Sequence, residues 1–120
     1  MTRNLLPSRR TSWNLHLVVG GKQTVFLTFG EYPDGTLGEL FIIANKRGSL
    51  VRALLDAFAI QFSLGLQHGV PLETAVAAMR DADFLPQGCV SGAEDFGVTE
   101  ASSILAAIAS VIDATYLKRK

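Results

Sequence analysis

The chain has 120 residues and a mass of 12.9 kDa, enough for one hydrophobic core and too little for two. Its apolar fraction of 48% excludes intrinsic disorder, because a chain this rich in large apolar side chains collapses into a core. Eleven basic and eleven acidic side chains cancel, and the isoelectric point lies near 6.7. Proteins that wrap DNA or bind an anionic membrane surface need an excess of positive charge, so we expect neither partner.

The N-terminal segment has no signal-peptide pattern, because residues 1–10 carry only a Leu-Leu pair among basic residues. The longest apolar stretch, residues 51–70, is too polar for a membrane span. Its polar members are Arg52, Asp56, Gln61 and His68. The single cysteine, Cys89, excludes an intramolecular disulfide and an all-cysteine metal site. We therefore expect a small soluble protein of the cytoplasm.

Apolar residues alternate along the first half of the chain, after an irregular N-terminal arm over residues 1–10. The first expected strand starts at Thr11, and its inward face carries Trp13, Leu15, Leu17 and Val19. Gly20-Gly21 tolerates the positive φ values of a two-residue hairpin turn. A second strand follows with Val25, Leu27 and Phe29 facing inward, and a third spans residues 39–44 after a turn at 32–35. The pattern predicts a three-stranded antiparallel meander.

The second half of the chain has the pattern of three helices. Ser49 is a good N-cap, and residues 50–67 contain no proline, which predicts a long helix that is apolar over most of its circumference. Gly69 is expected to stop it, and Pro71 fits the first turn of a second helix that ends near residue 83.

Residues 84–97 contain one proline and three glycines, which predicts a loop. Thr99 is expected to cap the last helix. Its buried stripe is Ile104, Leu105, Ile108, Val111 and Ile112, and its other side consists of alanines that permit close helix packing.

Three strands followed by three helices predict one α+β domain over residues 11–120, with a long and largely buried first helix. A helix this apolar needs cover on several sides, and a domain of this size buries only about two thirds of its unfolded surface. We therefore expect a homo-oligomer, a dimer or higher, in which a neighbouring subunit covers part of the helix.

The sequence contains no GxGxxG, GxxxxGK[ST], HExxH, GxSxG or CxxC motif. The only histidines, His16 and His68, are remote in sequence from each other and from Cys89, which makes a metal site or an activated nucleophile a weak hypothesis. We expect a protein that is not an enzyme and holds no metal or cofactor.

A candidate anion site lies where the third strand leads into the long helix. The N-terminus of a helix offers free backbone N–H groups and the positive end of the dipole. Four residues gather there: Lys46, Arg47, Ser49 and Arg52. The alternative interpretation is that Ser49 only caps its own helix and the basic residues are solvated in a turn.

Two further candidates lie elsewhere in the chain. Phe84, in a Pro/Gly-rich segment, is an aromatic ring that could stack on a base, or pack against the last helix instead. Arg9 and Arg10 in the arm could hold phosphates if the arm folds over a neighbouring subunit, or they are simply solvated.

Four segments together resemble a known domain: GEYPDGTLGELFI, KRGSLVRALLDAFAIQFSLGLQHGVPLE, FLPQGCVSG and ASSILAAIASVID. They are similar, in this order, to the C-terminal domain of adenosylcobalamin-dependent ribonucleotide reductases, over roughly residues 9–117. In those enzymes the domain follows a catalytic barrel that carries the radical cysteines and the cofactor. The sequence contains neither that barrel nor the cysteine-bearing tail, so we expect no ribonucleotide reduction by this chain alone.

An isolated domain of this size also resembles the phage family called Thoeris anti-defence protein one. Members of that family are small α+β oligomers that sequester signalling nucleotides, cyclic ADP-ribose isomers or cyclic oligonucleotides, without cleaving them.

Two functions therefore remain open. The first is a nucleotide sponge, which would act in the host cytoplasm if a phage encodes it. The second is a detached accessory domain of an adenosylcobalamin-dependent ribonucleotide reductase.

Overall fold

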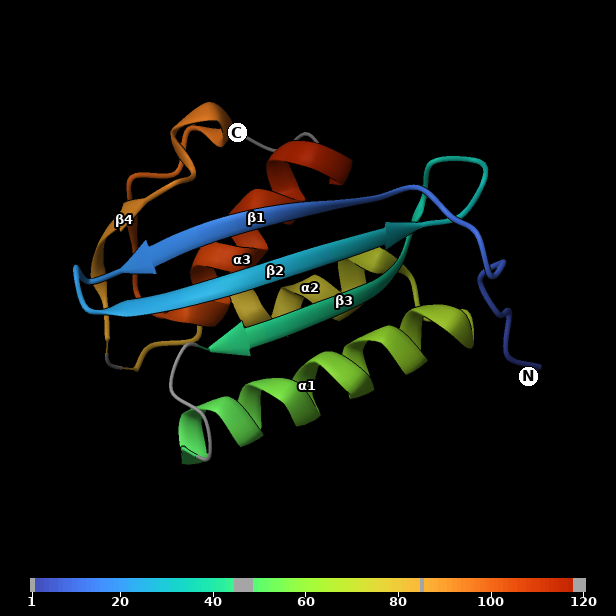
Figure 1. Ribbon diagram of the computed structural model, residues 1–120, viewed down its shortest axis with the longest axis horizontal. Helices are drawn as coiled ribbons and strands as arrows, with labels where there is room; N and C mark the ends of the chain where they lie inside the picture. Colours follow the sequence, from blue (N-terminus) through green and yellow to red (C-terminus); the bar gives the residue numbers. More distant parts are fainter. Residues whose placement is uncertain (1, 45–48, 85, 118–120) are drawn as a thin grey trace.

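The computed structural model describes residues 2–44, 49–84 and 86–117. The strands β1 (Ser12–Val19), β2 (Gln23–Glu31) and β3 (Leu37–Ala44) form the expected antiparallel meander (Figure 1). β3 begins two residues before the predicted position, next to a register shift between Gly30 and Glu31. The inward residues of β1 follow the predicted alternation, because Leu17 and Val19 are fully buried and Trp13 and Leu15 pack against the core.

The turn between β1 and β2 depends on its two glycines. Gly20 and Gly21 both have φ near +66°, in the left-handed region, and the N–H of Lys22 donates to the carbonyl of Val19 at 3.2 Å. A Cβ at Gly20 would also lie 2.8 Å from the carbonyl oxygen of Gln87, so this turn meets the segment before the fourth strand. The hairpin is confirmed, but three residues rather than two connect its strands, because Val19 pairs with Gln23.

The prediction of a loop over residues 84–97 is wrong for two segments, a strand at residues 88–91 and a short 3-10 helix at Glu94–Phe96. Gly88–Ser91 forms β4, which pairs with β1, and β5 (Glu100–Ala101) pairs with β4. The sheet therefore has five strands in the order β3-β2-β1-β4-β5. Four residues are too short to show an alternating pattern, and β4 forms because β1 offers it a free edge.

The first two helices begin and end close to their predicted positions. α1 spans Leu50–Gln67, with the Oγ of Ser49 accepting the N–H of Arg52 at 3.1 Å. α2 spans Leu72–Arg80 and ends before the predicted limit near residue 83.

The predicted cap of the last helix is wrong. α3 spans Ile104–Ile112 and continues as a π-helical turn over Asp113–Leu117. Ser103, rather than Thr99, is its N-cap, because its Oγ accepts the N–H of Ala106 at 2.9 Å. Thr99 instead lies before β5, where its carbonyl accepts the N–H of Val90.

One face of the sheet carries the core. α2 and α3 both lie behind the sheet in Figure 1 and cover that face. Seven of the nine residues of α3 are buried, including the predicted stripe members Ile104, Ile108, Val111 and Ile112. The alanines of α3 are buried as well, which lets α2 approach closely.

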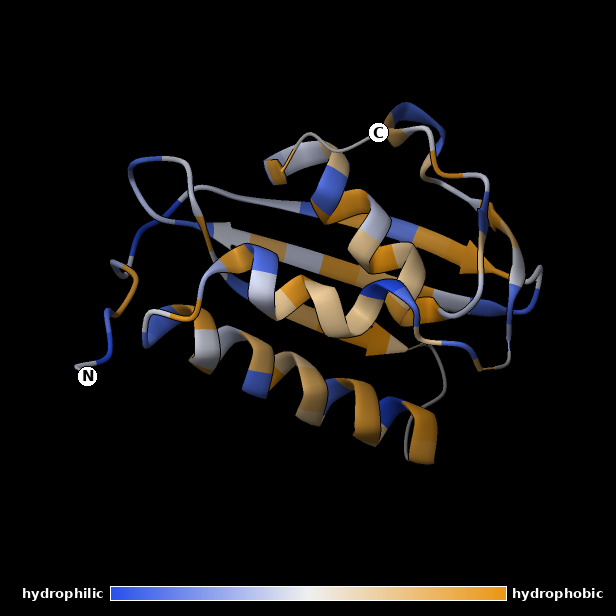
Figure 2. Ribbon diagram, turned by 180° about the vertical axis from the view of Figure 1, so that it is seen from behind, coloured by the Kyte–Doolittle hydropathy of each residue, from blue (hydrophilic) through white to orange (hydrophobic). Residues whose placement is uncertain are grey.

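α1 runs along the edge strand β3 rather than over the sheet (Figures 1 and 2). Ser63 Oγ accepts the N–H of Leu40 at 2.8 Å and donates to its carbonyl at 3.1 Å. Gln67 Nε2 donates to the carbonyl of Gly38 at 2.9 Å. These bonds satisfy backbone groups that an edge strand otherwise leaves open.

Only one side of α1 is buried within the chain, through Leu55, Ala59, Phe62, Ser63 and Gln67. The opposite side carries large exposed apolar residues: Leu50 is 73%, Leu54 59% and Ile60 50% exposed. By length and composition α1 could cross a membrane, a test that core helices of soluble proteins also pass.

The N-terminal arm packs on the chain. The N–H of Asn4 donates to the carbonyl of Gln67 at 2.6 Å, and Arg3 Nε donates to Oε1 of the same residue at 2.7 Å. Arg10 forms an ion pair with Glu39 at 2.6 Å. The arm therefore lies against β3 and the C-terminal end of α1.

Candidate functional site

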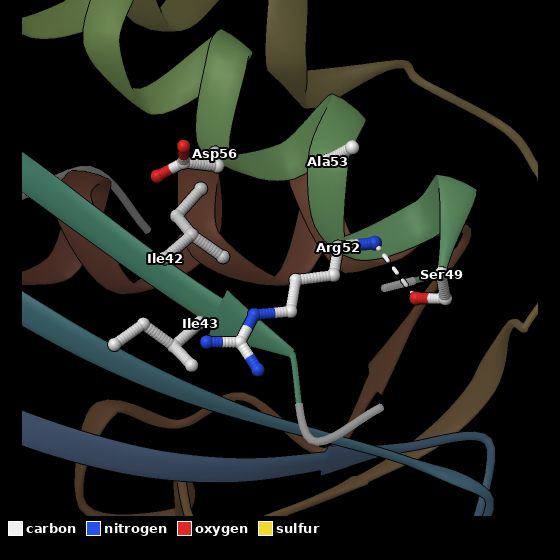
Figure 3. Close-up of a pocket in the computed structure, with 6 residues that line it drawn as sticks. All are labelled: Ile42, Ile43, Ser49, Arg52, Ala53 and Asp56. Carbon is white, nitrogen blue, oxygen red and sulfur yellow. Dashed lines mark hydrogen bonds between the residues drawn. The ribbon is translucent and has the colours of Figure 1, made fainter. Parts of the chain in front are cut away.

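A cavity of about 390 Å³ lies at the start of α1, beside the end of β3 (Figure 3). Its six lining residues come from these two elements: Ile42, Ile43, Ser49, Arg52, Ala53 and Asp56. The cavity is open to solvent and lies next to the N-terminus of α1, where backbone N–H groups and the helix dipole favour an anion.

Arg52 is the basic group of this cavity. Figure 3 shows its guanidinium extending across the end of β3 toward Ile43. Within the part of the chain that the structure describes, no hydrogen bond or ion pair engages this guanidinium. Asp56 lines the same cavity near Ile42, so a bound anion would meet one positive and one negative side chain.

Ser49 is the N-cap of α1. Its Oγ accepts the N–H of Arg52, as the alternative interpretation of this residue expected. Lys46 and Arg47 lie outside the described residues. Of the four residues predicted for the anion site, the structure therefore brings together Ser49 and Arg52.

The arm residues lie at the other end of α1. The arm contacts Gln67, the last residue of the helix, about 26 Å from its first residue at a rise of 1.5 Å per residue. Arg10 is engaged by Glu39 and by the carbonyl of Pro7, whereas Arg9 is exposed. Within one chain, neither residue belongs to the cavity at the start of α1.

Phe84 lies between α2 and β4 and is 38% exposed. Its backbone N–H donates to the carbonyl of Ser102 at 3.1 Å, which ties the segment to the residues before α3. Phe84 does not line the cavity beside Arg52.

A surface that was not predicted from the sequence lies on the open face of the sheet. Phe26, Phe41 and Ile43, here called the sheet patch, are each nearly half exposed. Phe26 pairs with Ile43 across β2 and β3, and the ring of His16 stacks on Phe26 at 4.5 Å. The alternation contained the signal, because one outward position of β2 and two of β3 carry large apolar residues where polar ones are usual.

A second cavity, of about 690 Å³, lies between the segment 96–100 and the end of α3. Arg80 lines it, but its guanidinium is engaged by both oxygens of Asp113 and by Glu73. These two carboxylates raise the pKa of Arg80.

The described part of the chain holds no group of three or more acidic, histidine or cysteine side chains suited to a metal.

Comparison with known proteins identifies the type of domain. The TSCPD domain family matches residues 2–116. The vitamin B12-dependent ribonucleotide reductase of Agrobacterium fabrum is 42% identical over 117 residues, 98% of this chain and 9% of the reductase. The reductase of Streptantibioticus cattleyicolor is 40% identical over 103 residues, 86% of this chain and 16% of the relative. The chain thus spans a small part of the length of these enzymes.

No solved structure matches the chain. The family match covers the arm, the whole sheet and all three helices, so the chain belongs to the TSCPD domain family and is related to vitamin B12-dependent ribonucleotide reductases.

Proposed function

We propose that this chain is a non-catalytic accessory domain that associates with the catalytic part of a vitamin B12-dependent ribonucleotide reductase. The observation that carries the proposal is the identity of 40–42% with segments of such enzymes over 86–98% of this chain. A domain kept this similar over its whole length is expected to keep the surface by which it contacts the rest of the enzyme.

The positions of the reactive side chains support a non-catalytic role. Val19 pairs with Val90, and the carbonyl of Cys89 accepts the N–H of Gly20, so Cys89 lies beyond the end of β1. His16 is four residues back along that strand, about 13 Å away at 3.3 Å per residue. A histidine activates a thiol only within hydrogen-bonding reach. His68 contacts the carbonyl of Leu64 through Nδ1, at the end of α1.

The sheet patch is the contact surface that we assign to this association. Phe26, Phe41 and Ile43 form an apolar group on a face that no helix covers in Figure 1. Apolar and aromatic side chains at the centre of an interface provide most of its binding energy. The catalytic part of the reductase would cover this face.

The test uses a form of the Agrobacterium fabrum reductase from which the segment that matches this chain has been deleted. Co-sedimentation measures the binding of the labelled chain to this shortened enzyme and to the intact one. We expect binding to the deleted enzyme and little to the intact one, whose own segment occupies the position. Phe41→Glu should weaken binding ten-fold or more, a loss of about 1.4 kcal/mol. Val70→Glu places the same charge on an apolar residue of similar exposure at the end of α1, and should bind normally. Equal binding to both enzymes, or none, would contradict the proposal.

We propose nucleotide sequestration, the anti-defence sponge, as the second candidate function. The observation that favours it is the Arg52 guanidinium beside a cavity at the N-terminus of α1. In this hypothesis Arg52, with Lys46 and Arg47 nearby in sequence, holds the phosphates of a cyclic ADP-ribose isomer or cyclic oligonucleotide, and Phe84 stacks on a base. The relatives described above are reductases and lend it no support.

Titration calorimetry with cyclic ADP-ribose isomers and cyclic dinucleotides tests this second candidate. A sponge should bind without turnover and release intact ligand on heat denaturation. Arg52→Ala should weaken binding about ten-fold, since a charge-assisted hydrogen bond contributes about 1.5–3 kcal/mol. Arg9→Ala is the matched control at the other end of α1. If Arg9→Ala loses the ligand and Arg52→Ala does not, the arm holds the phosphates, and an absence of binding to wild type removes the candidate.

A further inference from the structure

The exposed side of α1 is a stripe of apolar residues with one polar member, Gln61, opposite the side that packs on β3. The stripe follows the three- and four-residue spacing of one helix face and is here called the outer stripe. Its members are Leu50, Ala53, Leu54, Ala57, Ile60, Gln61 and Leu64. Leu64 is half-buried and the others are exposed. No charged residue belongs to the stripe, and it runs about 21 Å from Leu50 to Leu64 at 1.5 Å per residue.

The outer stripe has the same spacing when read from either end, and its residues match in character except at Ala53 and Gln61. Ala57 stands at its centre, with Leu54 and Ile60 three residues to each side. Leu50 and Leu64 stand seven residues to each side. When two such helices pack antiparallel about a two-fold axis at Ala57, Leu50 meets Leu64 of the other copy, and Leu54 meets Ile60. In an isologous dimer residue i contacts residue j and j contacts i, so each of these two apolar contacts occurs twice.

The centre of the stripe suits a close crossing. Ala53 and Ala57 are small, so two helix axes can approach to about 8 Å there, while the larger residues to each side fill the space between the helices. α1 lies at the periphery of the molecule, and no other element covers its outer side in Figure 1. A second copy can therefore approach without displacing the sheet or the arm.

We infer that the outer stripe of α1 is the interface of a homodimer, in which two copies pack antiparallel across a two-fold axis near Ala57. The pairing buries the three most exposed apolar side chains of the helix in both subunits. It leaves the sheet patch free, so it is independent of the association proposed above.

Light scattering measures the first consequence. The wild-type chain should have about twice its chain mass of 12.9 kDa at micromolar concentration. Leu54→Glu should be a folded monomer, since this side chain is exposed in the single chain and the charge opposes only the pairing. Phe41→Glu is the matched control on the sheet patch and should remain a dimer. A monomeric wild type, or a dimer that Phe41→Glu breaks and Leu54→Glu does not, would overturn the inference.

Cysteine cross-linking tests the direction of the pairing, in a Cys89→Ser background that removes the exposed native thiol. Ala57→Cys should form an intermolecular disulfide, because the two copies of this residue meet at the axis within reach of an S–S bond. Leu50→Cys should not, because its two copies lie about 21 Å apart in the antiparallel pair. Efficient linkage through Leu50→Cys would show a parallel arrangement, in which each residue of the stripe meets its own copy, and would overturn the inference.

A lipid surface is the competing occupant of the same stripe. Sedimentation with vesicles of phosphatidylcholine and phosphatidylglycerol distinguishes the two. We expect the dimer to stay in the supernatant. A wild-type monomer that sediments with vesicles, together with a Leu54→Glu variant that does not, would assign the stripe to a membrane surface and overturn the dimer.

Discussion

Tyr116 connects three distant parts of the chain through one hydroxyl group. It accepts a hydrogen bond from Trp13 Nε1 at 2.9 Å and donates one to Glu31 at 2.6 Å. The indole of Trp13 also stacks on Phe29 and on Phe96, with ring centroids 4.3 and 5.8 Å apart. Tyr116 therefore connects the turn after α3 to β1 and β2. Its hydrogen bond to Glu31 requires that the hydroxyl group keep its proton.

We expect Tyr116→Phe to lower the free energy of unfolding at neutral pH by about 1–3 kcal/mol, because Trp13 and Glu31 lose a partner. Urea denaturation at constant pH measures this change. Tyr32→Phe is the control at the other tyrosine, whose hydroxyl donates to the carbonyl of Asn4 near the surface. A Tyr116→Phe variant as stable as wild type would show that the three groups find equivalent partners in water.

The same residue predicts an alkaline limit to stability. Burial, and then the hydrogen bond to the Glu31 carboxylate, raise the pKa of Tyr116 above its usual value near 10. A folded pKa above the unfolded one stabilises the protein fully below about pH 10, and this contribution is lost as pH rises through the folded pKa. We expect the wild type to lose stability above pH 10 more steeply than Tyr116→Phe does, as measured by thermal melts across that range. Parallel pH profiles would contradict this assignment.

At the scale of elements, a side chain of α1 forms hydrogen bonds with the edge strand β3 that a neighbouring strand would otherwise form. Ser63 is buried and bonds both the N–H and the carbonyl of Leu40. We expect Ser63→Ala to destabilise the protein by about 1–3 kcal/mol, because two buried backbone groups lose their partner. Ser110→Ala is the matched control, since its hydroxyl only adds a bond to the carbonyl of Ala106 within α3. It should change stability by less than about 0.5 kcal/mol in the same denaturation experiment.

The position after β4 has no room for a side chain and is occupied by Gly92. Gly92 has φ of +99°, and a Cβ there would overlap the carbonyl oxygen of His16 in β1. Gly97 has φ of +74°, but a Cβ there would have no neighbour within 4 Å. Gly97→Ala should therefore cost only the left-handed conformation, about 1–2 kcal/mol. Gly92→Ala should cost clearly more, as measured by the urea midpoint, and equal costs would show that β4 moves away from β1 freely.

At the scale of the whole molecule, the N-terminal arm contributes to stability without joining the core. Its described contacts run through Asn4 and Arg3 to Gln67, and through Arg10 to Glu39. We expect deletion of residues 2–10 to leave a folded domain whose melting temperature falls by at least about 4 °C, since a loss of 1 kcal/mol has roughly this effect in a chain of this size. Calorimetry measures the shift. An unchanged melting temperature would show that these surface contacts are offset by the cost of ordering the arm.

The sequence by itself determined the elements whose signals are local. Three strands follow from the two-residue alternation, the hairpin from Gly20-Gly21, and both ends of α1 from Ser49 and Gly69. The pair of Ser49 and Arg52 at the start of α1 was also predictable, because it depends only on the cap and the first helical turn. In each case the signal lies within a few residues of the structure that it specifies.

Only the tertiary structure decided the rest, because it depends on contacts between residues far apart in the chain. β4 is a strand because β1 has a free edge, and the N-cap of α3 is Ser103 rather than Thr99 because β5 pairs with β4. The sheet patch is exposed because both core helices lie on the other face, and α1 keeps an uncovered stripe because it packs on the edge of β3. A local pattern shows which residues share a face, whereas the packing of the whole chain decides which face is covered.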